Sequence, residues 1–384
     1  MAALPGRATP DQPIGLAVSG GGDSMALLHL AADWARPRHQ SLLVLTVDHG
    51  LRPGSAAEAA TVAALCRDKG LAHQTLKWSG PRAVQAAARN ARHALLADAL
   101  REAGGRWLLT GHTHDDQLET LLMRARQGSG WYGLGGMDRV SVSPAWPEGR
   151  GIQIARPLLG ETRHHLRAVL TGLRSPWLDD PSNQDDRFER VRIRRLLTGH
   201  PALAAHVSRA HTRLAALRRA ERAALAHLID SETFPLGDGQ LAWRHGAATG
   251  ERAERLLSLL IQIAAGTATP PDRTATRSLL SALANQPSGR GRTLGGAWIA
   301  WHAGWAVLSR DPGCAAAAPS AAQPVWDGRF ERRTEHAPDP APTVRKGYPT
   351  PPPARLAPSL PPEPDDWHDL TAARLQALSA AMKG

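Results

Sequence analysis

The stretch Ser19-Gly-Gly-Gly-Asp-Ser24 carries residue types suited to binding phosphate. The apolar run 14–18 before it predicts a buried strand, and apolar residues in 25–32 recur at helical spacing. A strand, a glycine loop and a helix point backbone N–H groups and the positive end of the helix dipole at one spot, which favours a phosphate group. The glycines let a polyanion approach closely, and Ser24 is placed to cap the helix. We therefore expect phosphate contacts from Ser19, Gly20, Gly21, Gly22, Asp23 and Ser24.

Two commoner nucleotide-binding loops do not fit. No lysine lies between Gly20 and Leu30, so the loop is not a Walker A loop. Gly128-Ser-Gly-Trp-Tyr-Gly133 has the letters of a dinucleotide fingerprint, but it follows an expected helix rather than a strand, so a nicotinamide site is not indicated. Three glycines alone could equally form an ordinary turn. The whole hexapeptide, placed directly after a strand, favours a phosphate-binding loop instead.

The segment His112-Thr-His-Asp-Asp-Gln-Leu-Glu119 supplies a second group of reactive side chains at the start of an expected helix. Asp116 and Glu119 are three residues apart and His112 lies four before Asp116, so all three can share one helical face. A transition-metal site built from His112, His114, Asp115 and Asp116 is one interpretation. The alternative is an acidic first turn that complements the helix dipole, although this does not account for Glu119.

Alternating strands and helices must position these groups. Strands are predicted at residues 14–18, 42–48, 73–78, 107–111 and 152–158, with helices between them, for example at 84–103. This alternation predicts an α/β fold with a parallel, doubly wound sheet covered on both faces. Ligands of such sheets bind at the carboxyl ends of the strands. Residues 19–24, Asp48 and Gly111-His112 all fall there, so three separate segments converge on one edge.

The second half of the chain shows a different pattern of predicted elements. We expect a helix at 161–173, arginine-rich helices at 187–195 and 202–230, and then helices at 251–265 and 274–284 with a strand-like stretch at 297–308. The expected organisation is an N-terminal extension (1–13), an α/β domain with the phosphate-binding loop (14–200), a helical linker (201–232), a small C-terminal domain (233–310) and a Pro/Ala-rich, largely disordered tail (311–384).

Composition limits the class of protein. The 384 residues carry a formal charge of +11, which favours a polyanionic partner such as nucleic acid. The sequence has no apolar run long enough to span a bilayer, and its start lacks the apolar core of a secretory signal. Cys66 and Cys314 have no metal or redox spacing, so we expect a cytoplasmic protein with no membrane partner.

Several motifs in order resemble those of the tRNA(Ile)-lysidine synthase family, within the ATP-pyrophosphatase (PP-loop) superfamily. They lie collinearly between about residues 14 and 195: Ser19–Ser24, Val47–Arg52, Ala88-Arg-Asn-Ala-Arg92, Gly111-His112 with Asp116 and Glu119, Arg126–Gly130, Arg156-Pro-Leu158, Asp180–Asn183 and Arg190–Arg194. Gly291–Gly296 is similar to a C-terminal segment of many members. The chain departs from the family at His93 and Val191, where tyrosine and asparagine are usual.

The resemblance implies a ligase that forms a carbon–nitrogen bond. Family members adenylate cytidine 34 of a CAU-anticodon tRNA(Ile) with ATP, and the ε-amine of L-lysine then displaces AMP. The resemblance implies that Asp23 holds Mg²⁺ and takes part in catalysis. It implies that Asp116, Glu119 and Arg92 bind lysine. Contacts to tRNA or phosphate are implied for Arg89, Arg190 and Arg194. ATP contacts are implied for Ser19, Gly20, Gly21, Gly22, Asp23, Ser24, Asp48, His49, Gly111 and His112.

Three alternatives stay open from the sequence. A tRNA 2-thiocytidine enzyme of the same superfamily needs cysteines for a cluster or sulfur relay, which Cys66 and Cys314 do not supply. An amidotransferase needs a glutaminase domain or partner. A non-catalytic RNA-binding relative predicts broken motifs, yet Ser19–Ser24, Asp116 and Glu119 are intact.

Overall fold

The computed structural model describes residues 11–48, 50, 55–78, 85–178, 185–314, 325–332 and 367–383. The chain divides into two compact units, Met1–Arg222 and Ala223–Lys383, and each is described separately below. Among the described residues no helix is both long and apolar enough to cross a bilayer.

The first unit contains a six-stranded sheet that positions the candidate site. Its neighbouring strands are parallel except for the antiparallel pair at the β5 edge, so the expected parallel α/β sheet is confirmed. The three-residue strand β5 was not predicted, because so short a segment shows no usable periodicity. In sheet order the strands are β3 (Ala72–Lys77), β2 (Leu42–Asp48), β1 (Ile14–Ala17), β4 (Trp107–Thr110), β6 (Gln153–Ala155) and β5 (Val140–Val142).

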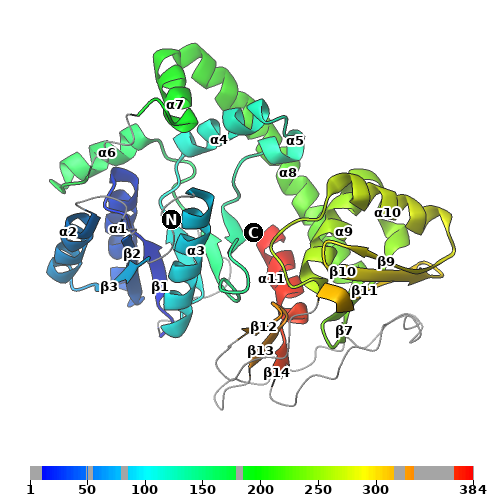
Figure 1. Ribbon diagram of the computed structural model, residues 1–384. Coiled ribbons are helices and arrows are strands. Elements are labelled where there is room, and N and C mark those ends of the chain that lie inside the picture. Colours follow the sequence, from blue (N-terminus) through cyan, green and yellow to red (C-terminus); the bar gives the residue numbers. More distant parts are fainter. Residues whose placement is uncertain are drawn as a thin grey trace. The chain divides into compact units, whose positions relative to one another are not determined.

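Helices cover both faces of this sheet. Helices α1 (Gly22–Ala35) and α2 (Ser55–Asp68) lie on one side and α3 (Gln85–Glu102) on the other (Figure 1). On the α3 side, Leu45 of β2 and Leu108 of β4 share a buried cluster with Leu96 and Leu100. Aliphatic strands buried on both faces are what a parallel sheet between two helical layers requires.

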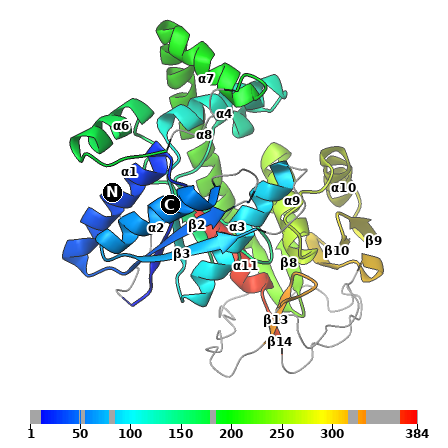
Figure 2. The same ribbon diagram turned by 60° about the vertical axis from the view of Figure 1, so that its left-hand side comes forward.

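Five further α-helices lie in the described residues of this unit, α8 only in part. Helix α6 packs beside α1 (Figure 2), while α4, α7 and α8 join through a small apolar cluster that includes Leu118, Leu197 and Val207. Helix α8 is continuous, and the boundary between the two units falls within it. The helices are α4 (His114–Arg126), α5 (Trp131–Leu134), α6 (Arg163–Gly172), α7 (Glu189–Gly199) and α8 (Pro201–Glu232).

The second unit pairs a five-stranded antiparallel sheet with two amphipathic helices. Helices α9 (Gly250–Ala264) and α10 (Arg273–Asn285) bury one face each, and buried Trp243 and Trp301 contribute to the shared core. The sheet order is β7 (Thr233–Gly237), β8 (Gln240–Arg244), β11 (Trp305–Arg310), β10 (Ala297–His302) and β9 (Ser288–Leu294). The single strand-like stretch expected at 297–308 is thus a hairpin, since a tight turn separates β10 from β11.

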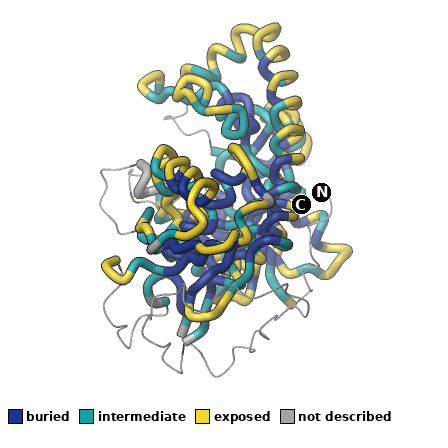
Figure 3. The backbone as a smooth tube through the Cα atoms, turned by 90° about the vertical axis from the view of Figure 1, so that its right-hand side faces the viewer, coloured by how far each residue is buried: buried dark blue, intermediate teal, exposed yellow. Residues whose placement is uncertain are grey.

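Figure 3 shows buried backbone in the interior and exposed positions along the outer turns of helices.

Part of the expected disordered tail is ordered. The described segments beyond Pro312 include β12 (Val325–Trp326), β13 (Phe330–Arg332), β14 (Trp367–Asp369) and α11 (Thr371–Lys383). For residues 371–383 the expectation of disorder is wrong, because Leu375 and Met382 enter the core of the second unit. Arg374 of the same helix donates to the carbonyl oxygens of Gln262 and Thr267 at 3.0 and 2.6 Å.

Candidate active site

The glycine loop joins β1 to α1 in the expected order of strand, loop and helix. Gly20 has a φ of 87°, in the left-handed region that favours glycine, and a Cβ there would lie 2.8 Å from a methyl group of Leu178. The backbone of Leu178 donates to the Gly20 carbonyl at 3.0 Å, so residues far along the chain support the loop from behind. A side chain at Gly20 would therefore be both strained and crowded.

The expectation that the Ser24 side chain caps helix α1 is wrong. Helix α1 begins at Gly22, its N-cap is Gly21, and no side chain caps it. Ser24 lies inside the first turn, where its hydroxyl donates to the Gly21 carbonyl at 2.8 Å and accepts from the Ser19 N–H at 3.2 Å. The serine thus braces the loop, and the N–H groups of the helix end are left uncapped by side chains. Such a helix end binds anions well.

The end of β4 meets this loop and starts the second acidic segment. A Cβ on Gly111 would lie 3.0 Å from the Asp23 carbonyl oxygen, so the two strand ends approach closely. Thr113 and Asp116 then form a capping box: the Thr113 N–H donates to Asp116 Oδ2 at 2.8 Å, and the Asp116 N–H donates to Thr113 Oγ1. Asp116 therefore fixes the start of α4 with one oxygen and presents the other, Oδ1, to the site.

Asp23, Asp116 and Glu119 come together around one side chain, that of Arg163. Its Nε lies 3.1 Å from Asp23 Oδ2, its Nη1 lies 2.6 Å from Glu119 Oε1, and its Nη2 donates to Asp116 Oδ1. Arg163 opens α6, and its backbone N–H donates to Asp115 Oδ2 at 2.8 Å. The site thus joins three elements: the α1 loop, the first turns of α4 and the start of α6.

Two arginines of α7 complete the cluster. Arg190 Nε lies 2.7 Å from Glu119 Oε2, and Arg194 Nε lies 2.9 Å from Glu119 Oε1. Arg190 also reaches Asp116 Oδ1 at 3.3 Å. Glu119 is only 1% exposed, whereas the two arginines are about one-third exposed. Three carboxylates therefore face three guanidinium groups, and the acid pair of Asp116 and Glu119 lies at the buried end.

The electrostatic environment separates Asp23 from the acid pair. Burial by itself raises a carboxyl pKa, but the charge of Arg163, with Arg190 at Asp116 and Arg194 at Glu119, holds the pKa of both acids below the ordinary value. The pKa of Asp23 is raised, chiefly by burial, with the charge of Arg163 opposing the shift. Asp116 and Glu119 are thus ionised at neutral pH and suited to binding a cation.

The structure describes only some of the other residues predicted for the site. Asp48 ends β2 and accepts from the Gly50 N–H at 2.9 Å, and His112 pairs with Thr110 across 2.9 Å. His49 lies outside the described residues, as does the motif 180–183. Arg92 is exposed on α3; Arg89 belongs to the same helix, but its side chain is outside the described part.

A fixed transition-metal site is not supported. Within the described ranges no group of three or more His, Cys, Asp or Glu side chains could hold a metal ion. His114 instead contacts Ser208 Oγ at 3.0 Å. The residues present do fit a magnesium–nucleotide complex, because the loop offers an uncapped helix end and Asp23 offers a partly exposed carboxylate beside it. Magnesium commonly combines one or two carboxylates with substrate phosphates.

Sequence reasoning missed Arg163. Its neighbours Thr162 and His165 form an ordinary cap, and nothing in the local pattern distinguishes it from Arg167 on the same helix. The one available signal was its position shortly after the Arg156-Pro-Leu158 motif, at the end of a parallel strand where ligands bind. Trp177 was likewise not singled out, although its indole packs so close to the loop that a Cβ on Gly22 would lie 3.5 Å from it.

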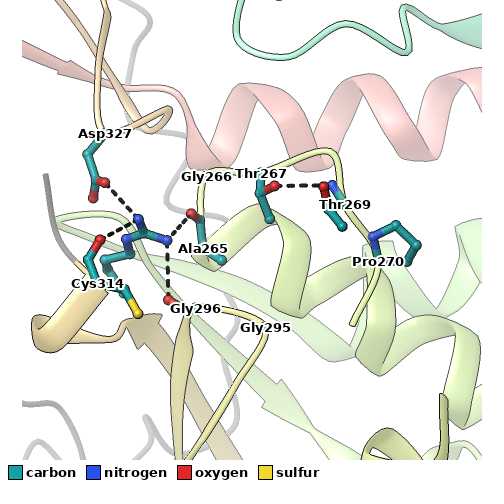
Figure 4. Close-up of a pocket in the computed structure, with 10 residues that line it drawn as sticks. Ala265, Gly266, Thr267, Thr269, Pro270, Gly295, Gly296, Cys314 and Asp327 are labelled. Atoms are coloured by element: carbon teal, nitrogen blue, oxygen red, sulfur yellow. Dashed lines mark hydrogen bonds and ion pairs between the residues drawn. The ribbon is translucent and has the colours of Figure 1, made fainter. Parts of the chain in front are cut away.

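A pocket of about 570 Å³ lies in the second unit, apart from the residues of this site (Figure 4). The guanidinium of Arg310 spans it, donating to the carbonyls of Ala265 and Cys314 at 2.6 Å each and pairing with Asp327 at 3.0 Å. These contacts join the end of α9 to the β12–β13 turn. The pocket is therefore built around a structural arginine.

Comparison with known proteins identifies the architecture. Residues 4–200 match the PP-loop domain family. This range contains the glycine loop, the acid pair and the three arginines that contact it, so the whole candidate site falls within the matched domain.

Curated relatives match over both units. A tRNA(Ile)-lysidine synthase of Hyphomonas neptunium is 48% identical over 299 residues, covering 78% of this chain and 81% of that protein. The corresponding synthase of Bradyrhizobium diazoefficiens is 43% identical, covering 70% and 77%. Among solved structures, the U34-tRNA thiolase NcsA from Methanococcus maripaludis has a TM-score of 0.44 at 17% identity, covering 55% and 74%, a likeness too distant to indicate a function.

Proposed function

The chain belongs to the tRNA(Ile)-lysidine synthase family of PP-loop enzymes, and from this premise we propose that it joins L-lysine to C2 of cytidine 34 in tRNA(Ile) with a CAU anticodon. ATP adenylates the cytidine, lysine displaces AMP, and pyrophosphate is the other product. The modified tRNA then changes from methionine to isoleucine specificity. Because the substrate is tRNA, we expect the reaction in the cytoplasm.

One observation carries the proposal: a single guanidinium reaches from the phosphate-loop carboxylate Asp23 to the buried acid pair of Asp116 and Glu119. A nucleotide on the loop and a cation on the acid pair would therefore be neighbours. This proximity is what a reaction between an adenylated base and an amine requires, because holding two reactants together removes much of the barrier.

Lysine fits the acid pair chemically. Its ε-amine has a pKa near ~10.4 in water, so it arrives as an ammonium. Ionised carboxylates bind that ammonium, and a proton must leave before the nitrogen can attack. The lowered pKa values of Asp116 and Glu119 suit them to binding and orienting the ammonium. We propose Arg92, Arg190 and Arg194 as candidates for the lysine carboxylate or tRNA phosphates, with Arg89 as a further tRNA contact.

Asp23 is the proposed magnesium ligand. Bound magnesium supplies positive charge that neutralises the nucleotide phosphates. We expect the backbone of residues 19–24 to contact the pyrophosphate, and Asp48, His49, Gly111 and His112 to line the rest of the nucleotide site. In this proposal residues 14–200 carry out catalysis and the helix 201–232 links them to the C-terminal part. Residues 233–310 form a small additional domain, together with the end of that helix and with residues 371–383, which share its core.

A thiolation function is not favoured. Cys66 is buried on α2, and burial raises the pKa of its thiol to about 11. A sulfur relay needs a thiolate, which such surroundings oppose. The two curated relatives described above, which match most of the chain, are both lysidine synthases.

The test is direct incorporation. The full chain is incubated with magnesium, ATP, labelled L-lysine and a CAU-anticodon tRNA(Ile) transcript, with the same transcript carrying uridine at position 34 as control. We expect label only in the first RNA, together with AMP and pyrophosphate. Asp23→Ala should abolish incorporation while leaving the melting temperature close to that of the unmodified chain. Formation of ADP, or equal labelling of both RNAs, would contradict the proposal.

A further inference from the structure

The acid pair is already fully occupied by protein groups. Asp116 Oδ2 accepts from Thr113, and Asp116 Oδ1 accepts from Arg163 and Arg190. Both oxygens of Glu119 accept from guanidinium groups, Oε1 from Arg163 and Arg194 and Oε2 from Arg190. An entering ammonium must therefore displace one of these donors.

The charges of the cluster lead to the same conclusion. The two carboxylates of the acid pair, Asp116 and Glu119, already face three guanidinium groups, those of Arg163, Arg190 and Arg194. A lysine ammonium would be a fourth cation around this pair, next to a carboxylate that is 1% exposed. Uncompensated buried charge is strongly unfavourable. Binding thus requires that one guanidinium leaves or that negative charge arrives.

Arg163 is the arginine placed to respond to both events. Among the described residues, it alone contacts Asp23 as well as Asp116 and Glu119. Its backbone is held by Asp115 and by the Thr162 cap of α6, so the side chain can turn while its main chain stays in place. Arg190 and Arg194 approach the acid pair from α7, on the side of Glu119.

We propose that Arg163 couples the two substrate sites: it holds the ammonium position of the acid pair while the nucleotide is absent, and turns to the phosphates when magnesium–ATP binds at Asp23. The inference rests on the proposed function. Asp23 would bind magnesium in place of the Arg163 guanidinium, and the nucleotide phosphates would offer that guanidinium a stronger anionic partner. The acid pair then becomes available to lysine. Arg163 is in this sense a positioning residue that sets the order of binding.

The coupling is measured as lysine affinity with and without nucleotide. L-lysine is titrated calorimetrically into the full chain, alone and with magnesium and α,β-methylene-ATP, whose bridging carbon resists cleavage between the α and β phosphates. We expect the nucleotide to tighten lysine binding about tenfold or more, within the usual range of about 5- to 150-fold for coupled sites. A lysine dissociation constant that does not depend on nucleotide overturns the inference without any variant.

Variants identify the residue responsible. Arg163→Met keeps the apolar stem and removes the charge. Without nucleotide, this variant should bind lysine about tenfold or more tightly than the unmodified chain does. Addition of nucleotide should then tighten its lysine binding by less than about threefold. Arg163→Lys keeps a competing cation and should bind lysine as weakly as the unmodified chain. Arg167→Ala, exposed on the same helix, is the matched control and should change neither value. Loss of a merely structural contact would weaken lysine binding, so a Met variant that binds lysine no better than the unmodified chain overturns the inference.

Failure of the proposed function and failure of the Arg163 inference give different results in these measurements. If the unmodified chain neither binds lysine with nucleotide and tRNA present nor incorporates it, the function and the inference both fall. If it incorporates lysine but binds it equally well with and without nucleotide, only the role of Arg163 falls.

Discussion

Arg163 Nη1 lies 2.6 Å from Glu119 Oε1, although 44 residues separate them in the sequence. The Glu119 side chain is buried and the Arg163 side chain is 16% exposed, so this pair forms the inner end of the site. Because the pair adjoins the phosphate-loop carboxylate Asp23, the acidic start of α4 is a candidate substrate-binding site and not only a helix cap.

Asp116→Asn and Glu119→Gln should each lower lysine incorporation by about a hundredfold or more, because the amide no longer holds the ammonium or assists its proton transfer. Affinities for ATP and tRNA should change much less. Incorporation is measured alongside both binding constants, with Glu161→Gln, a more exposed acid paired with His165, as control. Near-normal incorporation by both variants would reduce the acid pair to a helix-end feature.

Arg218 of α8 should be a structural residue. It and Arg222 both contact Asp138 Oδ2 at 2.7 Å, and all three side chains are largely buried. Arg218→Ala should therefore lower the free energy of unfolding by about 1–3 kcal/mol, since Asp138 loses one buried partner and keeps the other, Arg222. Thermal melting of the full chain checks this, and Arg219→Ala, exposed on the same helix, should leave the melting temperature nearly unchanged.

Arg209 and Arg213 lie exposed on the same helix and are candidates for RNA contact. We expect tRNA affinity to fall about tenfold or more between ~50 and ~200 mM salt, because neutralised phosphates release counterions. Arg209→Ala with Arg213→Ala should reduce the slope of log affinity against log salt without shifting the melting temperature. A slope identical to that of the unmodified chain would remove these two arginines from the interface.

His211 should make the chain less stable in mild acid. Burial, with the charge of neighbouring His114 adding to it, lowers the pKa of His211 below its ordinary value near ~6.5. The imidazole thus stays neutral in the folded chain while the unfolded chain takes up a proton, so its contribution is complete above pH ~6.5 and is lost as the pH falls below that value. The melting temperature should drop less between pH 7.5 and 5.5 in His211→Gln than in the unmodified chain. His206→Gln, exposed one turn earlier, should retain the full drop.

Helix α11 should be required by the second unit. Leu375 is buried in its core, so Leu375→Ala should cost about 2–5 kcal/mol of unfolding free energy. Denaturant unfolding of the full chain measures this, and Ala373→Ser, exposed on the same helix, serves as control. Equal stability of the two variants would mean that the helix contributes little.

Much of the site could be predicted from the sequence because its motifs are local. The glycine hexapeptide, the strand before it and the helix after it are read from a single window of residues. The parallel sheet follows from the alternation of such windows, and it brings Asp23, Asp48 and Gly111 to one edge. The spacing of Asp116 and Glu119 likewise fixed their common helical face before any packing was considered.

Tertiary structure alone decided which charged groups meet. Arg218 and Arg209 lie on one helix and look alike in sequence, yet the first is buried against Asp138 and the second faces solvent. The order of α11 had the same cause, since an Ala-rich segment after a Pro-rich one becomes a stable helix only when a distant core accepts Leu375. Arg163 is the sharpest case: its partners come from two other segments of the chain, and periodicity along one segment carries no information about where another segment folds.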